Sequence, residues 1–198
     1  MRSTFRTALV ALAASASLAA CMTAEGDDMG MGASASANTT VTVGGAPMYA
    51  NRNIVQNAVN SRDHTTLVAA VQAAGLVDTL SGAGPFTVFA PTNAAFERLP
   101  AGTVANLLRP ENRAMLTSVL TYHVVPGRMT AADLMRAIRT GGGMARLTTV
   151  QGATLTARMN GNNIVLTDAR GGTSTVTQGD VMQSNGVIHV TNAVSMPG

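Results

Sequence analysis

The stretch GPFTVFAPTNAAF, residues 84–96, holds three of the four phenylalanines of this 198-residue chain. If the stretch is extended, Phe86 and Phe89 point to opposite sides, because side chains alternate along a strand. Large apolar groups on both faces indicate a strand that is covered on both sides and lies inside a domain. Pro91 has no backbone N–H to donate and is therefore expected to end the strand.

Helical patterns flank this strand. Apolar residues recur at helical spacing over residues 64–75 and 110–123, and a third helix is expected over residues 131–139. Asp63 is positioned to cap the first of these helices. Thr130, with a carboxylate three residues later, resembles a capping box for the third.

The periodicity changes after the third helix. Short Thr- and Val-rich segments of alternating polarity occupy residues 147–150, 153–159, 163–168, 173–178 and 187–194. Gly- and Asn-rich turns separate them, which is typical of consecutive β-strands. A helical first half followed by strands that must pair with the early strand predicts an α+β domain. Residues 49–197 are enough for one such domain with its own core.

Two sequence blocks carry a family resemblance. GPFTVFAPTNAAF resembles the first signature block of fasciclin (FAS1) domains, and SNGVIHVTNAVSMP, residues 184–197, resembles the second. Between them, Tyr122 and His123 match the Tyr-His pair of the family. The resemblance implies a single fasciclin domain over residues 49–197, a β-sandwich wedge with helices packed along it. It also implies that the two blocks lie side by side as central strands, with the phenylalanines of the first block as core anchors.

The resemblance also implies a function. Fasciclin domains are mostly extracellular adhesion or matrix modules, and in animal members a Tyr-His region and an Asp-Ile segment before the second block have been linked to integrin recognition. The matching residues here are Tyr122 and His123 for the first region, and Asp180, Val181 and Met182 for the second. These five residues are the candidate partner-binding site, in which Val181 replaces the isoleucine of the family.

Several of these polar residues also have a structural interpretation. The ring nitrogens of His123 are expected to fix a buried turn through hydrogen bonds, because a buried polar group needs a partner. His189 lies within an apolar strand pattern and has the same alternative role. Asp180 could hold the loop before Asn185 through its carboxylate. The sequence leaves both interpretations open.

The first residues have the layout of an export signal. Residues 1–20 contain two arginines, a short apolar stretch and the ending Leu-Ala-Ala, and Cys21 follows directly. The apolar stretch is shorter than the roughly 20 residues that span a bilayer. The Leu-Ala-Ala-Cys ending resembles the lipobox of bacterial lipoproteins, which implies cleavage before Cys21 and acylation of this residue, the only cysteine of the chain. The alternative is an ordinary cleaved signal next to a chance cysteine.

Residues 21–48 are expected to form a flexible tether between the lipid and the domain. They are rich in Gly, Ala, Ser, Thr and Met, and hold too few large apolar groups to offset the entropy cost of ordering. Met22, Met29 and Met31 lie near two aspartates and could bind a soft metal ion, or they could reflect composition alone. The resemblance to bacterial lipoproteins also implies a destination: with Met22 rather than an aspartate after the cysteine, their sorting pattern favours the outer membrane. The domain is therefore expected in the cell envelope, facing the periplasm or the surface.

Composition argues against several other functions. Removal of the signal leaves eleven arginines against ten acidic residues, a net charge near +1, and the chain has no tryptophan. With few aromatic rings and no basic run, nucleic acid is not expected as a partner. The three histidines lack the spacing of a zinc site and no GxSxG motif occurs. Neither a metal site, a cofactor nor catalysis is therefore expected.

The sequence predicts a non-catalytic extracytoplasmic binding or adhesion module, held at the membrane by acylated Cys21. The expected partner is an envelope or matrix protein or a glycan. The alternative function is that of a periplasmic carrier, with a small apolar ligand in a cleft between sheet and helices. Leu116, Met135 and Met182 are expected to line that cleft, because methionine suits adaptable pockets.

Overall fold

The computed structural model describes residues 40–198. The predicted signal over residues 1–20, the acylation site at Cys21 and the tether residues up to 39 lie outside the described residues. The helices of the described part are α1 (Ile54–Ala58), η1 (Arg62–His64), α2 (Thr65–Ala74), α3 (Val77–Ser81), α4 (Asn93–Glu97), α5 (Thr103–Leu107), η2 (Pro110–Asn112), α6 (Arg113–Tyr122) and α7 (Ala131–Thr140). The strands are β1 (Val41–Val43), β2 (Ala46–Met48), β3 (Phe86–Pro91), β4 (Val124–Pro126), β5 (Met144–Thr148), β6 (Thr154–Asn160), β7 (Asn163–Thr167), β8 (Thr173–Gln183) and β9 (Gly186–Thr191).

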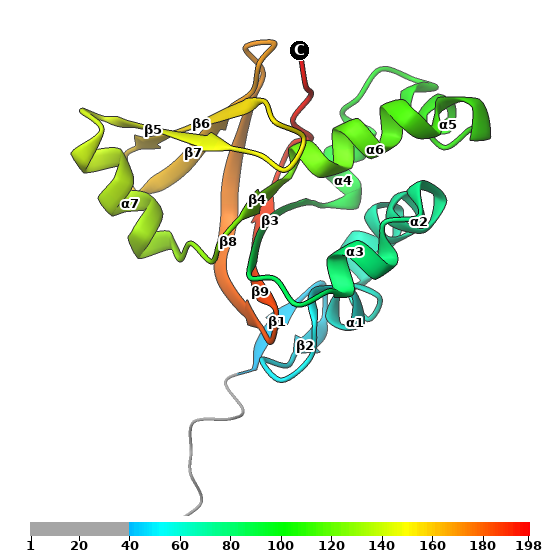
Figure 1. The fold of residues 1–198 in the computed structure, drawn as a ribbon, viewed down its shortest axis with the longest axis horizontal. Helices are drawn as coiled ribbons and strands as arrows, with labels where there is room; N and C mark the ends of the chain where they lie inside the picture. Colours follow the sequence, from blue (N-terminus) through cyan, green and yellow to red (C-terminus); the bar gives the residue numbers. More distant parts are fainter. Residues whose placement is uncertain (1–39) are drawn as a thin grey trace, which may run out of the picture. The chain divides into compact units, whose positions relative to one another are not determined.

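Seven of these strands form one mixed sheet in the order β4-β3-β9-β8-β7-β6-β5 (Figure 1). β3 and β9, which hold the two signature blocks, lie side by side and parallel, with Phe89 opposite His189. The other neighbouring strands of the sheet are antiparallel. The N–H of Val150 donates to the carbonyl of Val124 at 2.7 Å, so the two ends of the sheet approach each other and nearly close it. The predicted α+β class and the central position of both blocks are confirmed.

Helices cover the sheet on two sides and create two apolar clusters. One cluster joins α1, α2, α3 and α6 to β3 and β9, and includes Val88. The other joins α7 to β5, β6 and β7, and includes Phe89, which is 0% exposed. β3 is thus covered on both faces, as its sequence predicted. Phe86 packs against the first cluster on the opposite side from Phe89, but it is only partly buried.

Most helix ends follow their local signals. Gly75 ends α2 in a left-handed conformation. Thr130 and Asp133 form the predicted capping box of α7: the Asp133 N–H donates to the Thr130 hydroxyl at 3.2 Å, and the Thr130 N–H donates to the Asp133 carboxylate at 3.1 Å. The prediction that Asp63 caps α2 is wrong. Asp63 lies within η1 and His64 precedes α2, because a 3-10 turn leads into the helix.

A β-hairpin over residues 41–48 corrects the predicted boundary between tether and domain. Val43 and Met48 are 4% and 3% exposed and belong to the first apolar cluster. The turn begins at Gly44, whose φ of +57° disfavours any larger residue; a Cβ there would also lie 2.5 Å from the hydroxyl oxygen of Ser61. The prediction missed this hairpin because residues 21–48 are on average rich in Gly and Ala, and only a few apolar side chains among them anchor the hairpin. The domain therefore begins earlier than residue 49.

Candidate functional site

The five candidate partner-binding residues lie in different environments. Tyr122, His123 and Val181 are only 0%, 3% and 1% exposed, so their side chains lie inside the domain. Asp180 and Met182 are partly exposed on β8. Burial removes the first three from the surface that a partner could contact, which corrects the predicted site. Partner contact by Asp180 and Met182 stays a prediction.

Tyr122 connects the end of α6 to the sheet. Its hydroxyl donates to the Thr154 carbonyl at 2.9 Å and accepts from the Ala169 N–H at 3.0 Å. Burial raises the pKa of Tyr122, which keeps the hydroxyl protonated and able to donate. The family's Tyr position therefore serves here to hold α6 against β6 and the turn that follows β7.

His123, directly after α6, uses both ring nitrogens to bind backbone. Nδ1–H donates to the Val119 carbonyl at 2.8 Å, and Nε2 accepts from the Ser195 N–H at 2.9 Å. A backbone N–H requires an acceptor, so Nε2 carries no proton and the ring is neutral. Burial lowers the pKa of His123 and favours the same state. These contacts fit the interpretation of His123 as a residue that fixes a buried turn.

Asp180 on β8 and His189 on β9 connect the sheet to the start of α7 and to Met129 before it. His189 Nε2–H donates to the Met129 carbonyl at 2.8 Å, and its Nδ1 accepts from the Asp180 N–H at 3.4 Å. The His189 ring also stacks on Phe89, with 5.6 Å between ring centroids. The Asp180 carboxylate accepts from the Ala131 N–H at 2.7 Å in the first turn of α7. Free N–H groups at a helix start favour a carboxylate, so Asp180 attaches β8 to this helix.

The buried side chain of Asn185 connects the loop before β9 to α1 and to the end of α3, whereas its sequence pattern indicates only a turn. Its Oδ1 accepts from the Ile54 N–H at 3.0 Å, and its Nδ2 donates to the carbonyls of Leu80 and Gly82 at 2.8 and 2.9 Å. These partners are between 103 and 131 residues away in the chain, so no local pattern could reveal them. The loop before β9 is held by Asn185 itself, whereas Asp180 binds the start of α7.

His64 is a third buried histidine, with 3% of its surface exposed. Its Nδ1 lies 2.8 Å from the hydroxyl oxygen of Ser61. Its Nε2 is buried and has no hydrogen-bond partner among residues 40–198. Burial lowers the pKa of His64, and the nearby Ala90 carbonyl opposes this shift more weakly. One polar ring atom thus remains unsatisfied in apolar surroundings.

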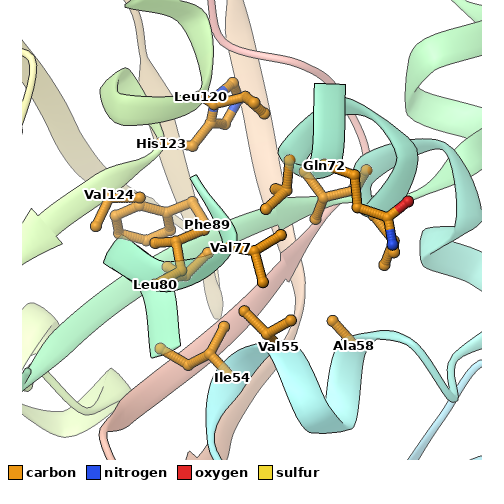
Figure 2. Close-up of a pocket in the computed structure, with 14 residues that line it drawn as sticks. Ile54, Val55, Ala58, Gln72, Val77, Leu80, Phe89, Leu120, His123 and Val124 are labelled. Carbon is orange, nitrogen blue, oxygen red and sulfur yellow. The ribbon is translucent and has the colours of Figure 1, made fainter. Parts of the chain in front are cut away.

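An apolar pocket lies among α1, α2 and α3 and reaches β3, β4 and α6 in the core (Figure 2). It encloses about 70 Å³, and its lining side chains are apolar except for those of Gln72 and His123. Leu116, Met135 and Met182, which were predicted to line a ligand cleft, do not line this pocket. That prediction rested on the adaptability of methionine, whereas valine, leucine, isoleucine and alanine form most of the wall.

A smaller cavity of about 30 Å³ adjoins this pocket. The two share Ile54, Ala58, Leu67 and Val88 in their walls, and His64 lines the smaller one. A wider groove of about 500 Å³ lies between β4, α7 and β5, but it is more open to solvent and partly polar. The apolar pocket with its adjoining cavity is therefore the enclosed space in which a ligand could be held.

Residues 40–198 contain no group of three His, Cys, Asp or Glu side chains placed to hold a metal ion. The possible soft-metal ligands Met22, Met29 and Met31 lie outside the described residues. Within the same described range, no helix combines the length and the apolar character needed to cross a membrane.

The parallel pairing of two signature strands and the helices on both sides define the class of domain, and comparison with known families agrees. The chain belongs to the fasciclin family, because the model of the fasciclin domain matches residues 62–197. This match confirms the resemblance carried by the two sequence blocks and covers most of the described domain.

Known proteins similar to this chain include both bacterial and animal members. Protein sll1483 of Synechocystis sp. is 46% identical over 144 residues, which are 73% of this chain and 73% of that protein. The cell surface glycolipoprotein MPB83 of Mycobacterium bovis is 35% identical over 122 residues, which are 62% of this chain and 48% of that protein. The solved FAS1 domain pair of the insect cell adhesion molecule Fasciclin I has a TM-score of 0.51 and 24% identity, and covers 64% of this chain and 42% of that chain. This last likeness shows the fold alone.

Proposed function

We propose that this protein is a non-catalytic binding module of the cell envelope, in which an acylated Cys21 holds a fasciclin domain outside the cytoplasm. The observation that carries the proposal is the fasciclin match over residues 62–197 downstream of a Leu-Ala-Ala-Cys sequence. A similar protein supports it, since it is named a cell surface glycolipoprotein. A lipid anchor would raise the local concentration of the domain near weakly bound envelope partners.

The histidine geometry supports a non-catalytic role. Both ring nitrogens of His123 and of His189 contact backbone groups, and both rings are buried. A general base needs a nitrogen that can reach a proton of the substrate. These two histidines therefore serve the fold, and the function is expected to come from surfaces and cavities.

Anchoring is tested by fractionation of the complete chain and of a Cys21→Ala variant expressed in a bacterium. The wild-type protein should sediment with membranes, whereas the variant should move to the soluble extracytoplasmic fraction because it cannot be acylated. Met22→Ala is the matched control and should remain at the membrane. A Cys21→Ala protein that sediments like the wild type would reject the anchor.

Asp180 and Met182 are the remaining candidates for direct contact with an envelope or matrix protein or a glycan. Asp180→Asn removes the charge but keeps an oxygen for the Ala131 N–H. Met182→Gln has a matched control in Met115→Gln, because Met115 is 59% exposed on a distant helix. Saturable binding of the purified chain to isolated envelopes should weaken in both candidate variants and not in the control. Equal binding by all proteins of unchanged melting temperature would reject this surface.

The apolar pocket favours a second candidate function, the carriage of a small apolar ligand. Protein cores are normally close-packed, and this pocket instead leaves about 70 Å³ of apolar space. Protein extracted gently from its own membranes should then carry a small molecule that native mass spectrometry detects and that denaturation removes. An extracted protein whose only added mass survives denaturation would reject the carrier function.

A further inference from the structure

The apolar pocket has an exposed end and a buried end. The Gln72 amide extends away from the other labelled side chains in Figure 2 and is exposed, and the lining residues Val55 and Val77 are partly exposed. Phe89 and Leu120, on the buried side, are 0% and 5% exposed. The pocket therefore leads from the surface of the helical layer into the core.

The chemistry of the wall restricts what can occupy this pocket. No charged side chain lines it, and His123 is its one titratable lining residue within the described domain. Both nitrogens of His123 are already bonded to backbone, at 2.8 and 2.9 Å. Burying an unpaired polar group in such surroundings is costly. An occupant must therefore be apolar inside and can place a polar group only near Gln72.

The size and arrangement of the space favour a narrow occupant. A water-sized group needs about 10–15 Å³, so a volume of about 70 Å³ holds about five to seven such groups. The adjoining cavity of about 30 Å³, which shares Ile54 and Val88, adds room for about two or three more. Two adjoining small cavities suit a linear chain better than a bulky ring system.

We propose that this pocket binds the alkyl chain of an uncharged amphiphile, with its polar group at Gln72 and its chain directed toward Val88 and Phe89. This proposal rests on the carrier function given above as the second candidate and names its ligand class. The proposal places the end of a longer chain beyond Val88, in the smaller cavity that shares this residue and whose wall includes His64. The His64 ring is therefore a built-in reporter of chain length.

The test uses n-alkanols from butanol to dodecanol, titrated into the complete chain with Cys21→Ala so that its own acyl chains are absent. Each buried methylene should lower the Kd about fourfold. The gain in affinity per methylene should stop between about seven and ten carbons, where the available space ends. NMR signals of the His64 ring should shift only with the longer alkanols. A Kd that is independent of chain length, or that keeps falling up to dodecanol, would overturn the proposal.

Variants that fill the pocket provide the matched comparison. Ala58→Phe and Val68→Phe each add a ring to the lining from a different helix, whereas Val59→Phe adds the same ring at a neighbouring residue that is 51% exposed. Hexanol binding should weaken at least about tenfold in the first two, because the ring replaces two or more methylenes of the ligand. It should be unchanged in Val59→Phe. Only variants that still unfold cooperatively in urea are compared. If Ala58→Phe or Val68→Phe passes this check and binds hexanol as the wild type does, the proposal is overturned.

A compact ring separates failure of this proposal from failure of the carrier function. If toluene binds in the pocket and alkanols do not, the linear-chain proposal is wrong and the carrier function stands. If neither binds, both are wrong. The anchored binding module is tested separately by the fractionation of Cys21→Ala.

Discussion

Acid should destabilise this domain, because three buried histidines are held neutral. Burial lowers the pKa of His64, His123 and His189 below the usual value of 6.5. Nε2 of His123 and Nδ1 of His189 also accept backbone N–H groups, which a protonated ring cannot do. Below pH 6.5 the unfolded chain takes up protons that the folded chain does not. The free energy of unfolding is therefore greatest above pH 6.5 and falls as the pH drops below it.

Proton linkage sets an upper limit on this loss. A histidine that stays neutral in the folded state and titrates near 6.5 when unfolded loses about 1.4 kcal/mol of stabilisation between pH 7.5 and 5.5. Three such histidines give at most about 4 kcal/mol, a large part of a typical domain stability of about 5–15 kcal/mol. Asp63, Asp168 and Asp180 raise the pKa of the histidine nearest to each, against the larger effect of burial, so the measured loss should be below the limit.

Urea unfolding at pH 7.5, 6.5 and 5.5, at constant ionic strength, measures this effect. The midpoint should fall between pH 7.5 and 5.5 while the slope of the transition stays constant. His123→Asn should lower stability at pH 7.5 but remove about a third of the pH-dependent part, since one of three linked groups is lost. Hydrogen bonds with Thr130 lower the pKa of Asp133 from its usual value of 3.8. Protonation of Asp133 therefore affects stability only at a pH below the range of this measurement. A urea midpoint that is constant from pH 7.5 to 5.5 would refute the claim that the three histidine rings are buried and neutral in the folded domain.

Five further substitutions test the packing. Phe89→Ala should cost about 3–5 kcal/mol in urea unfolding because its ring is fully buried, and Phe86→Ala should cost less because it is partly exposed; equal losses would contradict this. Gly186→Ala should lower the melting temperature strongly, since a Cβ there would lie 2.1 Å from the Phe86 carbonyl oxygen. A Cβ at Gly161 would have no neighbouring atom within 4 Å, so Gly161→Ala should cost only the roughly 1–2 kcal/mol of a left-handed backbone conformation. Similar melting temperatures for Gly186→Ala and Gly161→Ala would exclude the predicted clash at Gly186. Asn185→Ala should cost several kcal/mol, because three buried backbone groups lose their partner at about 1–3 kcal/mol each; a loss below about 1 kcal/mol would show that water replaces the side chain.

The central strand and the class of fold could be predicted because their signals are local. Phe86 and Phe89 alternate across one short strand, and the Thr130 capping pair spans only three residues. The hairpin at residues 41–48 escaped prediction because its few apolar side chains lie in a Gly- and Ala-rich segment. The contacts of Asn185 escaped for a different reason, since its partners come close only after the whole chain has folded.

The sequence could identify the residues of the candidate site, but it could not predict whether they lie at the surface or in the core. The family motif identified Tyr122 and His123, yet their burial depends on β6, on Ala169 and on Ser195, which pack over them from distant parts of the sequence. The apolar pocket has no motif, because four helices and two strands each contribute small or branched side chains to its wall. Its ligand class follows from the volume and polarity of the wall, which only the folded chain reveals.

Native mass spectrometry of the protein extracted gently from its own membranes tests the proposed function most directly. The predicted result is a chain that begins at Cys21 and carries acyl mass that survives denaturation. A chain that begins elsewhere, or that begins at Cys21 without added mass, would contradict the proposal of a lipid-anchored envelope module.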